Sequence, residues 1–212
     1  MDRPAPTFDA QILASIPAML QGVIDAGDLS GAVTVIWRGG EIVDVRALGQ
    51  ADIAAGRPMR RDTLFRIASM TKPVTSLAAL MLMEEGAFQL SDPIDRWAPE
   101  LTGMKVLRAA DGPLAEAYPS PRSITFEDLF THRAGLAYAF SAVGPIAHAY
   151  HAALGDVLAS GMDPDAWMKA LGELPLLYPP GQRFHYSHAT DVLGFIVGRI
   201  AGKPFREVLI ER

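Results

Sequence analysis

Three stretches of the chain carry apolar residues at the three- and four-residue spacing of a helix with one buried face. They cover residues 8–26, 74–86 and 189–201. A glycine ends or directly follows each stretch, and glycine is common there because it adopts the left-handed backbone conformation that closes many helices. The pattern therefore predicts amphipathic helices near the start, in the first half and near the end of the chain.

Two runs rich in β-branched residues lie between the first and second helical stretches. Residues 31–37 read Gly-Ala-Val-Thr-Val-Ile-Trp, and residues 41–47 read Glu-Ile-Val-Asp-Val-Arg-Ala. β-Branched side chains favour strands, and the intervening Arg38-Gly39-Gly40 has the residues of a tight turn. The sequence predicts an antiparallel hairpin that serves as scaffold.

The middle of the chain predicts short helices joined by loops. Residues 102–122 hold three prolines and two glycines without a clear period, which is typical of a loop. Residues 124–130 predict a short helix with Thr125 near its start, and residues 137–174 predict two weaker helical pieces. The order of helix, hairpin and helical middle indicates an α+β fold without internal repeats.

Composition narrows the class of protein. The chain has 212 residues, 50% of them hydrophobic, and a net charge of -5, which is enough for one large domain or two small ones with a real core. The mild acidity and the lack of a basic run give no reason to expect a nucleic-acid partner. The sequence has no cysteine, so disulfides, thiolate catalysis and cysteine metal sites are excluded.

Targeting and metal-binding signals are also missing from the sequence. No apolar run reaches membrane-spanning length, and residues 1–10 lack the apolar core of a signal peptide. We therefore expect a cytoplasmic protein with no membrane partner. His148-x-x-His151 and His185-x-x-His188 lack the carboxylate context of a zinc hydrolase, and no glycine-rich phosphate loop is present. The sequence predicts neither a metal nor a cofactor.

A serine and a lysine stand one turn apart at the start of the second helical stretch. The segment reads Ser69-Met70-Thr71-Lys72, and Pro73 follows it. Proline belongs in the first turn of a helix because the N–H that it lacks has no partner there. Pro73 therefore predicts a helix start close to Ser69, with the Cβ atoms of Ser69 and Lys72 about 5–6 Å apart on one face.

This placement suits nucleophilic catalysis. The positive end of the helix dipole favours a developing serine alkoxide and disfavours a charged lysine, and burial also favours the neutral amine. Ser69 is thus a candidate nucleophile and Lys72 a candidate base. The alternative is that Ser69 caps the helix and Lys72 is solvated.

Tyr186 is a candidate proton carrier. A tyrosine held beside a lysine can exchange protons with a serine, because the nearby cation favours the phenolate. Tyr186 follows the turn Pro179-Pro180-Gly181 and precedes the third helical stretch. The alternative is a half-buried tyrosine with a structural role.

Three motifs in this order resemble those of a known family. They are LFRIASMTK at residues 64–72, LFTHRAGL at residues 129–136 and YPPGQRFHYSHATDVLG at residues 178–194. From about Gly31 to its end, the chain resembles the serine β-lactamase-like family. The likeness is greatest to the family VIII carboxylesterases, which are related to class C β-lactamases and D-Ala-D-Ala carboxypeptidases.

The resemblance implies a fold and a division of the chain. The fold would be a β-lactamase/DD-peptidase-like antiparallel sheet flanked by helices, with a mostly helical domain inserted. Residues 1–65 would form the N-terminal helix and hairpin of the α/β domain. Residues 66–212 would form the nucleophile helix and the mostly helical domain, which ends in the helix after the tyrosine motif.

The resemblance also implies roles for individual residues. Ser69 would be the acylated nucleophile, with its backbone N–H as one of two oxyanion-hole donors. Lys72 would activate Ser69 and orient Tyr186, and Tyr186 would be the general base that passes the proton to the leaving group. Lactamases of this type usually carry Tyr-x-Asn at this motif, whereas the third position here is His188. We expect His188 to bind substrate as a hydrogen-bond donor to the acyl group, which favours esters over lactams.

One motif of the family is missing. A Lys-, His- or Trp-x-Gly sequence on a later strand usually supplies the second oxyanion donor, and Trp37-Arg38-Gly39 matches it only by letters, in the hairpin turn. We therefore expect this chain to be the N-terminal part of a longer fold, with the missing C-terminal strands on a second chain or segment. Two strands alone do not make a stable sheet, and the apolar faces of the first and last helices would lack partners.

The main functional hypothesis is a serine hydrolase that acts on small-molecule, short-chain carboxylic esters through an acyl-enzyme on Ser69. An acyltransferase with the same residues is a close variant. A β-lactamase or D-Ala-D-Ala carboxypeptidase is the second hypothesis, and a non-catalytic penicillin-recognising module is the third. The absence of Gly-x-Ser-x-Gly argues against an α/β-hydrolase.

Overall fold

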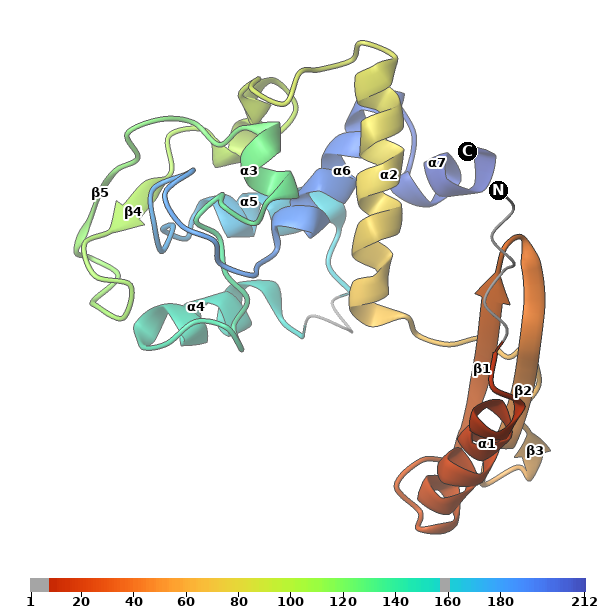
Figure 1. The fold of residues 1–212 in the computed structure, drawn as a ribbon. Helices are drawn as coiled ribbons and strands as arrows, with labels where there is room; N and C mark the ends of the chain where they lie inside the picture. Colours follow the sequence, from red (N-terminus) through yellow and green to blue (C-terminus); the bar gives the residue numbers. More distant parts are fainter. Residues whose placement is uncertain (1–7, 157–160) are drawn as a thin grey trace. The chain divides into compact units, whose positions relative to one another are not determined.

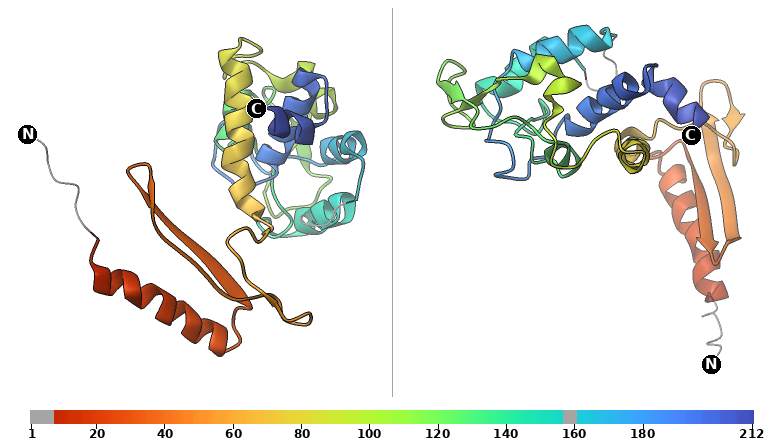
Figure 2. Two further views of the ribbon diagram at one scale, coloured as in Figure 1. Left: turned by 90° about the vertical axis from the view of Figure 1, so that its right-hand side faces the viewer. Right: turned by 90° about the horizontal axis from the view of Figure 1, so that it is seen from above.

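The computed structural model describes residues 8–156 and 161–212. The chain divides into two compact units. The first, which we call the N-terminal unit, ends at Arg66, and the second, which we call the helical unit, is Ile67–Arg212. Figures 1 and 2 draw the elements of each unit.

The N-terminal unit consists of one helix and a small antiparallel sheet. Helix α1 (Ala10–Asp25) is capped by the carboxylate of Asp9, which accepts backbone N–H groups of the first turn. Strands β1 (Gly31–Arg38) and β2 (Glu41–Asp52) form the predicted hairpin, and α1 contacts β2. The turn requires glycine, because Gly39 and Gly40 have φ values of 59° and 88°.

Strand β2 extends beyond the predicted residues 41–47. It continues to Asp52 and pairs with the short strand β3 (Arg57–Pro58), so the sheet order is β1-β2-β3. The segment around Gly56 and Pro58, whose glycine and proline are typical of a loop, therefore includes a third, very short strand. Pairing with β1 as far as Gly49, and with β3 at Gln50 and Asp52, decides this extension, and the sequence of β2 alone does not reveal either pairing.

The helical unit is built around two long helices, α2 (Thr71–Glu84) and α6 (Ala189–Ala201), which lie side by side. Figure 1 shows α6 with α3 (Phe126–Phe130) on its other flank and α7 (Phe205–Glu211) after it. The remaining elements are the 3₁₀ turns η1 (Ala68–Met70), η2 (Ile94–Arg96) and η3 (Pro99–Leu101), the strands β4 (Lys105–Leu107) and β5 (Ala117–Pro119), and the helices α4 (Pro145–Leu154) and α5 (Pro164–Gly172).

Two of these elements differ from the prediction. Strands β4 and β5 pair antiparallel within residues 102–122, which the sequence predicts as loop. Helix α7 follows Pro204 and is not predicted by the sequence pattern. Both elements are short, and the strands are joined by a proline- and glycine-containing segment, so neither produces a pattern long enough to recognise.

The expectation that the last helix lacks a partner is wrong. Eight residues of α6 are buried, including Leu193, Ile196 and Val197, each with no exposed surface. Helices α2, α3 and α7 supply the cover. The first helix was also expected to lack a partner for its apolar face, and α1 agrees better with this expectation, because none of its residues is buried.

Helix α3 is anchored by local polar contacts. Thr125 and Asp128 form a capping box, in which each side chain binds the other residue's backbone N–H. Arg122 adds two hydrogen bonds to the Asp128 carboxylate, at 2.5 and 2.9 Å. Phe126 from the same helix stacks on Phe88, with ring centroids 3.7 Å apart. The start of α3 is thereby fixed to the core.

Within residues 8–156 and 161–212, no helix has the length and apolar character needed to cross a membrane.

Candidate active site

Ser69 lies in the 3₁₀ turn η1, directly before helix α2. The helix begins two residues later with Pro73 in its first turn, as the sequence predicts. Ala68 precedes the serine with a φ of 44°, a left-handed conformation that costs a non-glycine residue energy. The turn presents Ser69 on the surface of the helical unit, as an exposed side chain at the positive end of α2.

Tyr186 contacts Ser69 directly. Its Oη lies 2.7 Å from Ser69 Oγ, although the two residues are 117 positions apart in the sequence. Either hydroxyl can donate the proton of this hydrogen bond. The distance lies within the range in which a tyrosine can take up or return the serine proton.

Lys72 completes the group one turn after Ser69. Its Nζ is 4.8 Å from the ring centroid of Tyr186 and 5.3 Å from that of Tyr138. Both distances are within cation–π range. The half-buried Lys72 thus places a positive charge beside the tyrosine that touches the serine.

The surroundings of Tyr186 favour its phenolate. Burial raises the pKa of Tyr186, but hydrogen bonds from Lys72 and Ser69 and the charge of Lys72 lower it more. The pKa of Tyr186 therefore lies below that of an ordinary tyrosine. Ser69, Lys72 and Tyr186, which the sequence singles out, come together in one place.

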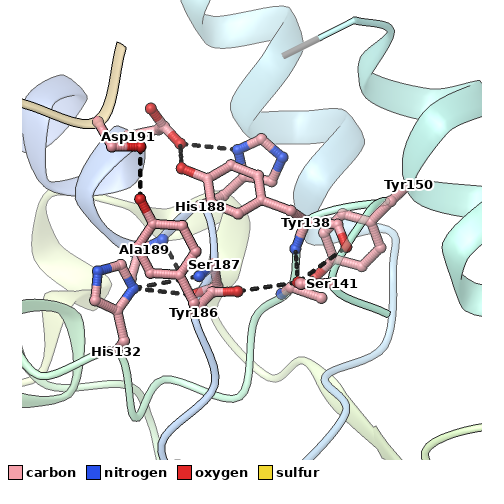
Figure 3. A network of polar contacts seen from close by, with 11 residues as sticks. His132, Tyr138, Ser141, Tyr150, Tyr186, Ser187, His188, Ala189 and Asp191 are labelled. Atoms are coloured by element: carbon pink, nitrogen blue, oxygen red, sulfur yellow. Dashed lines mark hydrogen bonds and ion pairs between the residues drawn. The ribbon is translucent and has the colours of Figure 1, made fainter. Parts of the chain in front are cut away.

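His132 holds the segment that carries Tyr186. Its Nδ1 accepts the backbone N–H of Ser187, and its backbone oxygen accepts the N–H of His185. Its ring lies against Tyr186, with centroids 4.9 Å apart (Figure 3). Burial, together with the charge of Lys72, lowers the pKa of His132, so the ring is neutral near pH 7.

His132 and Ala68 share an unusual backbone conformation. His132 has a φ of 53°, and among the described residues these two are the only non-glycine residues with a positive φ. One adjoins the serine and the other contacts the tyrosine. Backbone strain of this kind persists only where surrounding contacts hold it, and it is common at active sites.

Ser141 binds the backbone on both sides of the site. Its Oγ is 3.0 Å from the carbonyl oxygen of Tyr186 and accepts the N–H of Tyr138 at 3.0 Å (Figure 3). It also lies 3.2 Å from His185 Nε2. The loop that carries Tyr138 is thereby tied to the segment that carries Tyr186.

His188 lies beside the group but is turned towards other residues. It is 4% exposed, and its Nδ1 is 2.8 Å from Asp191 Oδ2. Its ring packs on Tyr138 at 4.1 Å and on Trp167 at 5.1 Å between centroids. The prediction that His188 donates a hydrogen bond to substrate stays a prediction.

Sequence reasoning missed two residues of this cluster. Tyr138 donates its hydroxyl proton to Asp191 Oδ2 at 2.9 Å, so Asp191 binds both Tyr138 and His188 (Figure 3). The position of Asp191 one helical turn after His188 is the signal that could have identified it. Tyr138 gives no such signal, because it approaches the cluster from a loop.

No group of three or more histidine, aspartate or glutamate side chains suited to a metal ion occurs in the described part of the chain. The chemistry that the cluster itself can perform is proton exchange between a tyrosine and a serine next to a lysine.

The fold of the helical unit and a Ser-x-x-Lys serine in contact with a tyrosine define the class of β-lactamase-like proteins. The chain belongs to the Beta-lactamase family, whose profile matches residues 16–212.

Curated relatives match almost the whole chain. The present protein is 53% identical to Protein Rv1367c of Mycobacterium tuberculosis over 195 residues, which cover 92% of this chain and 47% of that protein. It is 40% identical to Esterase EstB of Burkholderia gladioli over 204 residues, which cover 94% of this chain and 49% of that protein. The chain thus spans about half the length of the curated relatives it matches.

Solved structures share the fold. EstCE1, a hydrolase with promiscuous acyltransferase activity, superposes with a TM-score of 0.77 at 33% identity, covering 95% of this chain and 50% of that one. Unliganded simvastatin synthase (LovD) from Aspergillus terreus superposes with a TM-score of 0.73 at 27% identity, covering 97% of this chain and 52% of that one. The predicted β-lactamase/DD-peptidase-like fold is confirmed.

Proposed function

We propose that the protein is a serine hydrolase that cleaves short-chain carboxylic esters through an acyl-enzyme on Ser69. Lys72 and Tyr186 are the proton-transfer pair. The observation that carries this proposal is the 2.7 Å contact between Ser69 Oγ and Tyr186 Oη, beside a lysine that lowers the pKa of that tyrosine. The 40% identity to Esterase EstB supports the choice of esters.

The reaction follows from these contacts. Ser69 Oγ attacks the carbonyl carbon of the ester while its proton passes to the phenolate of Tyr186. The tetrahedral intermediate then expels the alcohol, which takes the proton from Tyr186. In the second half, a water molecule gives a proton to Tyr186 and attacks the acyl-enzyme. The new tetrahedral intermediate expels Ser69 Oγ, which takes that proton from Tyr186, so that the carboxylic acid is released and both Ser69 and the phenolate are restored.

Acyl transfer to an alcohol is the second candidate function, and it differs only in the last step. An alcohol in place of water would produce a new ester from the same acyl-enzyme. The promiscuous acyltransferase activity of EstCE1 and the 30% identity to Acyltransferase calJ of Penicillium decumbens favour this variant.

The oxyanion of the intermediate needs hydrogen-bond donors, and the backbone N–H of Ser69 is one candidate. We propose that a second chain or segment, with strands that extend the sheet, supplies the other donor. The exposed apolar side chains of the hairpin support this idea: Val35, Trp37 and Ile42 are 52%, 67% and 45% exposed. Apolar strand surfaces of this kind are usually covered in a complete sheet.

Hydrolysis of p-nitrophenyl butyrate by the chain, with Ser69→Ala as control, tests the proposal. We expect turnover that disappears in Ser69→Ala, and labelling of Ser69 by a fluorophosphonate, located by mass spectrometry. Activity that survives in Ser69→Ala would contradict the proposal. If a folded chain has no activity, the assay is repeated after addition of the C-terminal half of a relative.

Two further substrates separate the alternatives. Nitrocefin turnover faster than ester turnover would favour a β-lactamase. Formation of butyl butyrate in the presence of butanol would favour an acyltransferase. Absence of both turnover and fluorophosphonate labelling, in the chain supplied with the second segment, would indicate a non-catalytic module.

A further inference from the structure

Two tyrosines lie within reach of Lys72, and only one of them can be the base for Ser69. Lys72 Nζ is 4.8 Å from the ring centroid of Tyr186 and 5.3 Å from that of Tyr138. The two rings are 5.5 Å apart. Distance from the lysine alone therefore does not distinguish the two phenols.

Their hydroxyl groups have opposite partners. The hydroxyl of Tyr186 meets the hydroxyl of Ser69 at 2.7 Å, whereas the hydroxyl of Tyr138 meets a carboxylate oxygen of Asp191 at 2.9 Å. An ionised carboxylate only accepts hydrogen bonds, so Tyr138 must keep its proton to make this contact. Tyr186 has no such restriction, because a serine hydroxyl can donate to a phenolate.

The pKa directions agree with this geometry. Burial raises the pKa of Tyr138, and the charge of Asp191 and the hydrogen bond to it raise that pKa further. The pKa of Tyr186 is lowered instead, chiefly through Lys72 and Ser69.

Asp191 is itself held in place. Its Oδ2 also binds His188 Nδ1 at 2.8 Å (Figure 3). Asp191 belongs to the first turn of α6, whose buried face packs in the core. The His188 ring, 4% exposed, is packed between Tyr138 and Trp167. The carboxylate therefore receives two hydrogen bonds from rings that cannot easily move.

We propose that Asp191 is a positioning residue of this site. By accepting hydrogen bonds from Tyr138 and His188, it fixes Tyr138 as a proton donor and leaves Tyr186 as the tyrosine that exchanges a proton with Ser69. The proposal rests on the proposed function, because it assigns a role within the same proton path.

Titratable groups face Tyr186 from three directions. Lys72 faces it from α2, His132 from the segment after α3, and Asp191 from α6. The negative charge of Asp191 raises the pKa of Tyr186 and so opposes Lys72. Neutralising Asp191 should therefore lower the pH at which both tyrosines ionise, with the larger change at Tyr138.

The test compares Asp191→Asn and Tyr138→Phe, singly and together, with Tyr150→Phe as a matched control. Tyr150 is also a buried tyrosine beside His188, but its hydroxyl accepts the N–H of Ala137 and does not contact Asp191. The Tyr150→Phe variant therefore measures how the loss of a buried phenol hydroxyl affects the fold when the contact with Asp191 is kept. Tyrosinate absorbance is titrated in each variant, with Tyr138→Phe and Tyr186→Phe to assign the signals, and kcat and KM are measured with p-nitrophenyl butyrate.

We expect kcat to fall about tenfold in Asp191→Asn and in Tyr138→Phe, with KM within about twofold of the parent. The double variant should be no worse than the poorer single variant, since both changes remove the same contact. Tyr138 should ionise at lower pH in Asp191→Asn. Tyr150→Phe should keep the parent kcat even if its melting temperature falls.

Three results would overturn the proposal. They are an unchanged tyrosinate titration of Tyr138 in Asp191→Asn, single-variant losses in kcat that multiply in the double variant, and an equal loss of kcat in Tyr150→Phe. Failure of the proposed function would look different, because the parent activity would then survive in Ser69→Ala. The titration needs no activity, so it decides the role of Asp191 in that case too.

Discussion

The two units of the chain differ in how much apolar surface they bury. Met59 is the one buried hydrophobic residue in the described part of the N-terminal unit, whereas α2, α3, α5 and α6 of the helical unit enclose a continuous core. The hairpin instead exposes Trp37 and Val35, which are 67% and 52% exposed. Since burial of apolar surface drives folding, the core of the helical unit contributes much more to stability than the partly buried residues of the N-terminal unit do.

The same contrast holds for chemistry. Ser69, Lys72, Tyr186, His188 and Asp191 all belong to the helical unit. Catalytic side chains must be held to within fractions of an ångström, and such precision needs a packed support. The candidate site therefore lies in the unit that has the continuous hydrophobic core.

The largest expected effect is on catalysis by the helical unit. Lys72→Ala removes the charge that lowers the pKa of Tyr186, so kcat/KM for p-nitrophenyl butyrate should fall about 10²- to 10⁴-fold, at least as far as in Tyr186→Phe. Lys105→Ala, an exposed lysine in the same unit, is the control and should keep activity. Activity near the parent value in Lys72→Ala would contradict the proton path.

The pH dependence of the parent has a defined sign. Because the pKa of Tyr186 is lowered, kcat/KM should rise with pH through that lowered pKa and reach its plateau below the range in which free tyrosine ionises. In Lys72→Ala the remaining activity should need a higher pH. A plot of kcat/KM against pH for both proteins checks the order of the two midpoints.

The next largest effect is on stability, measured with a matched pair of isoleucines. Ile196→Ala in α6 removes a side chain with no exposed surface and should lower the free energy of unfolding by about 2–5 kcal/mol. Ile42→Ala in the hairpin removes one that is 45% exposed and should cost less than about 1 kcal/mol. Urea unfolding followed by circular dichroism gives both values, and equal losses would refute the contrast between the units.

A smaller loss of stability is expected when either of two ion pairs, one in each unit, is broken. Arg122→Met leaves the buried Asp128 carboxylate without its guanidinium and should cost about 1–3 kcal/mol. Arg57→Met breaks the exposed pair with Asp52 in the N-terminal unit and should lower the free energy of unfolding less than Arg122→Met does, because solvent screens the pair. The same unfolding measurements at neutral pH compare the two variants.

Acid should reduce the contribution of the Arg122–Asp128 pair to the free energy of unfolding. Burial raises the pKa of Asp128, but the hydrogen bonds to Arg122 and Thr125 lower it more, so the folded-state pKa lies below the unfolded one. This contribution is therefore present above the unfolded pKa of about 3.9 and is lost as pH falls through the folded pKa. The stability difference between the parent and Arg122→Met should shrink as the pH falls below about 4, and a constant difference would show that this ionisation is not linked to folding.

The smallest effect concerns substrate preference. His188→Asn restores the Tyr-x-Asn pattern of lactamases, and we expect the ratio of nitrocefin to ester turnover to rise a few-fold. An unchanged ratio would show that this position does not set the choice. Because Asp191 binds His188 Nδ1, the melting temperature of the variant must be measured beside the ratio.

Much of the fold could be predicted from local sequence patterns. The helix over residues 189–201 has the predicted bounds, and the hairpin turn falls on Gly39 and Gly40. These features depend on side-chain periodicity and on backbone freedom within a few residues. The strand pair β4–β5 and helix α7 were missed, because each is too short to carry a period of its own.

The candidate site was predictable in its members but not in its arrangement. The spacing of Ser69 and Lys72, with Pro73 after them, places both in one turn at a helix start. The position of Tyr186 between a turn and the last helix made it a candidate, and the resemblance implied its role. No local pattern indicates Tyr138, which reaches the cluster from a loop and meets an aspartate 53 residues away. The surroundings of His188 depend in the same way on side chains brought together by folding.

The sequence by itself determined the elements that flank the site, the nucleophile turn and the family. Those features follow from interactions within a few residues and from motifs kept in order. Only the tertiary structure decided that Tyr186 meets Ser69 across 117 residues and that Asp191 takes the hydroxyl of Tyr138. Contacts of this kind depend on how α2, α6 and the loops between them pack, and packing is a property of the whole core rather than of any one segment.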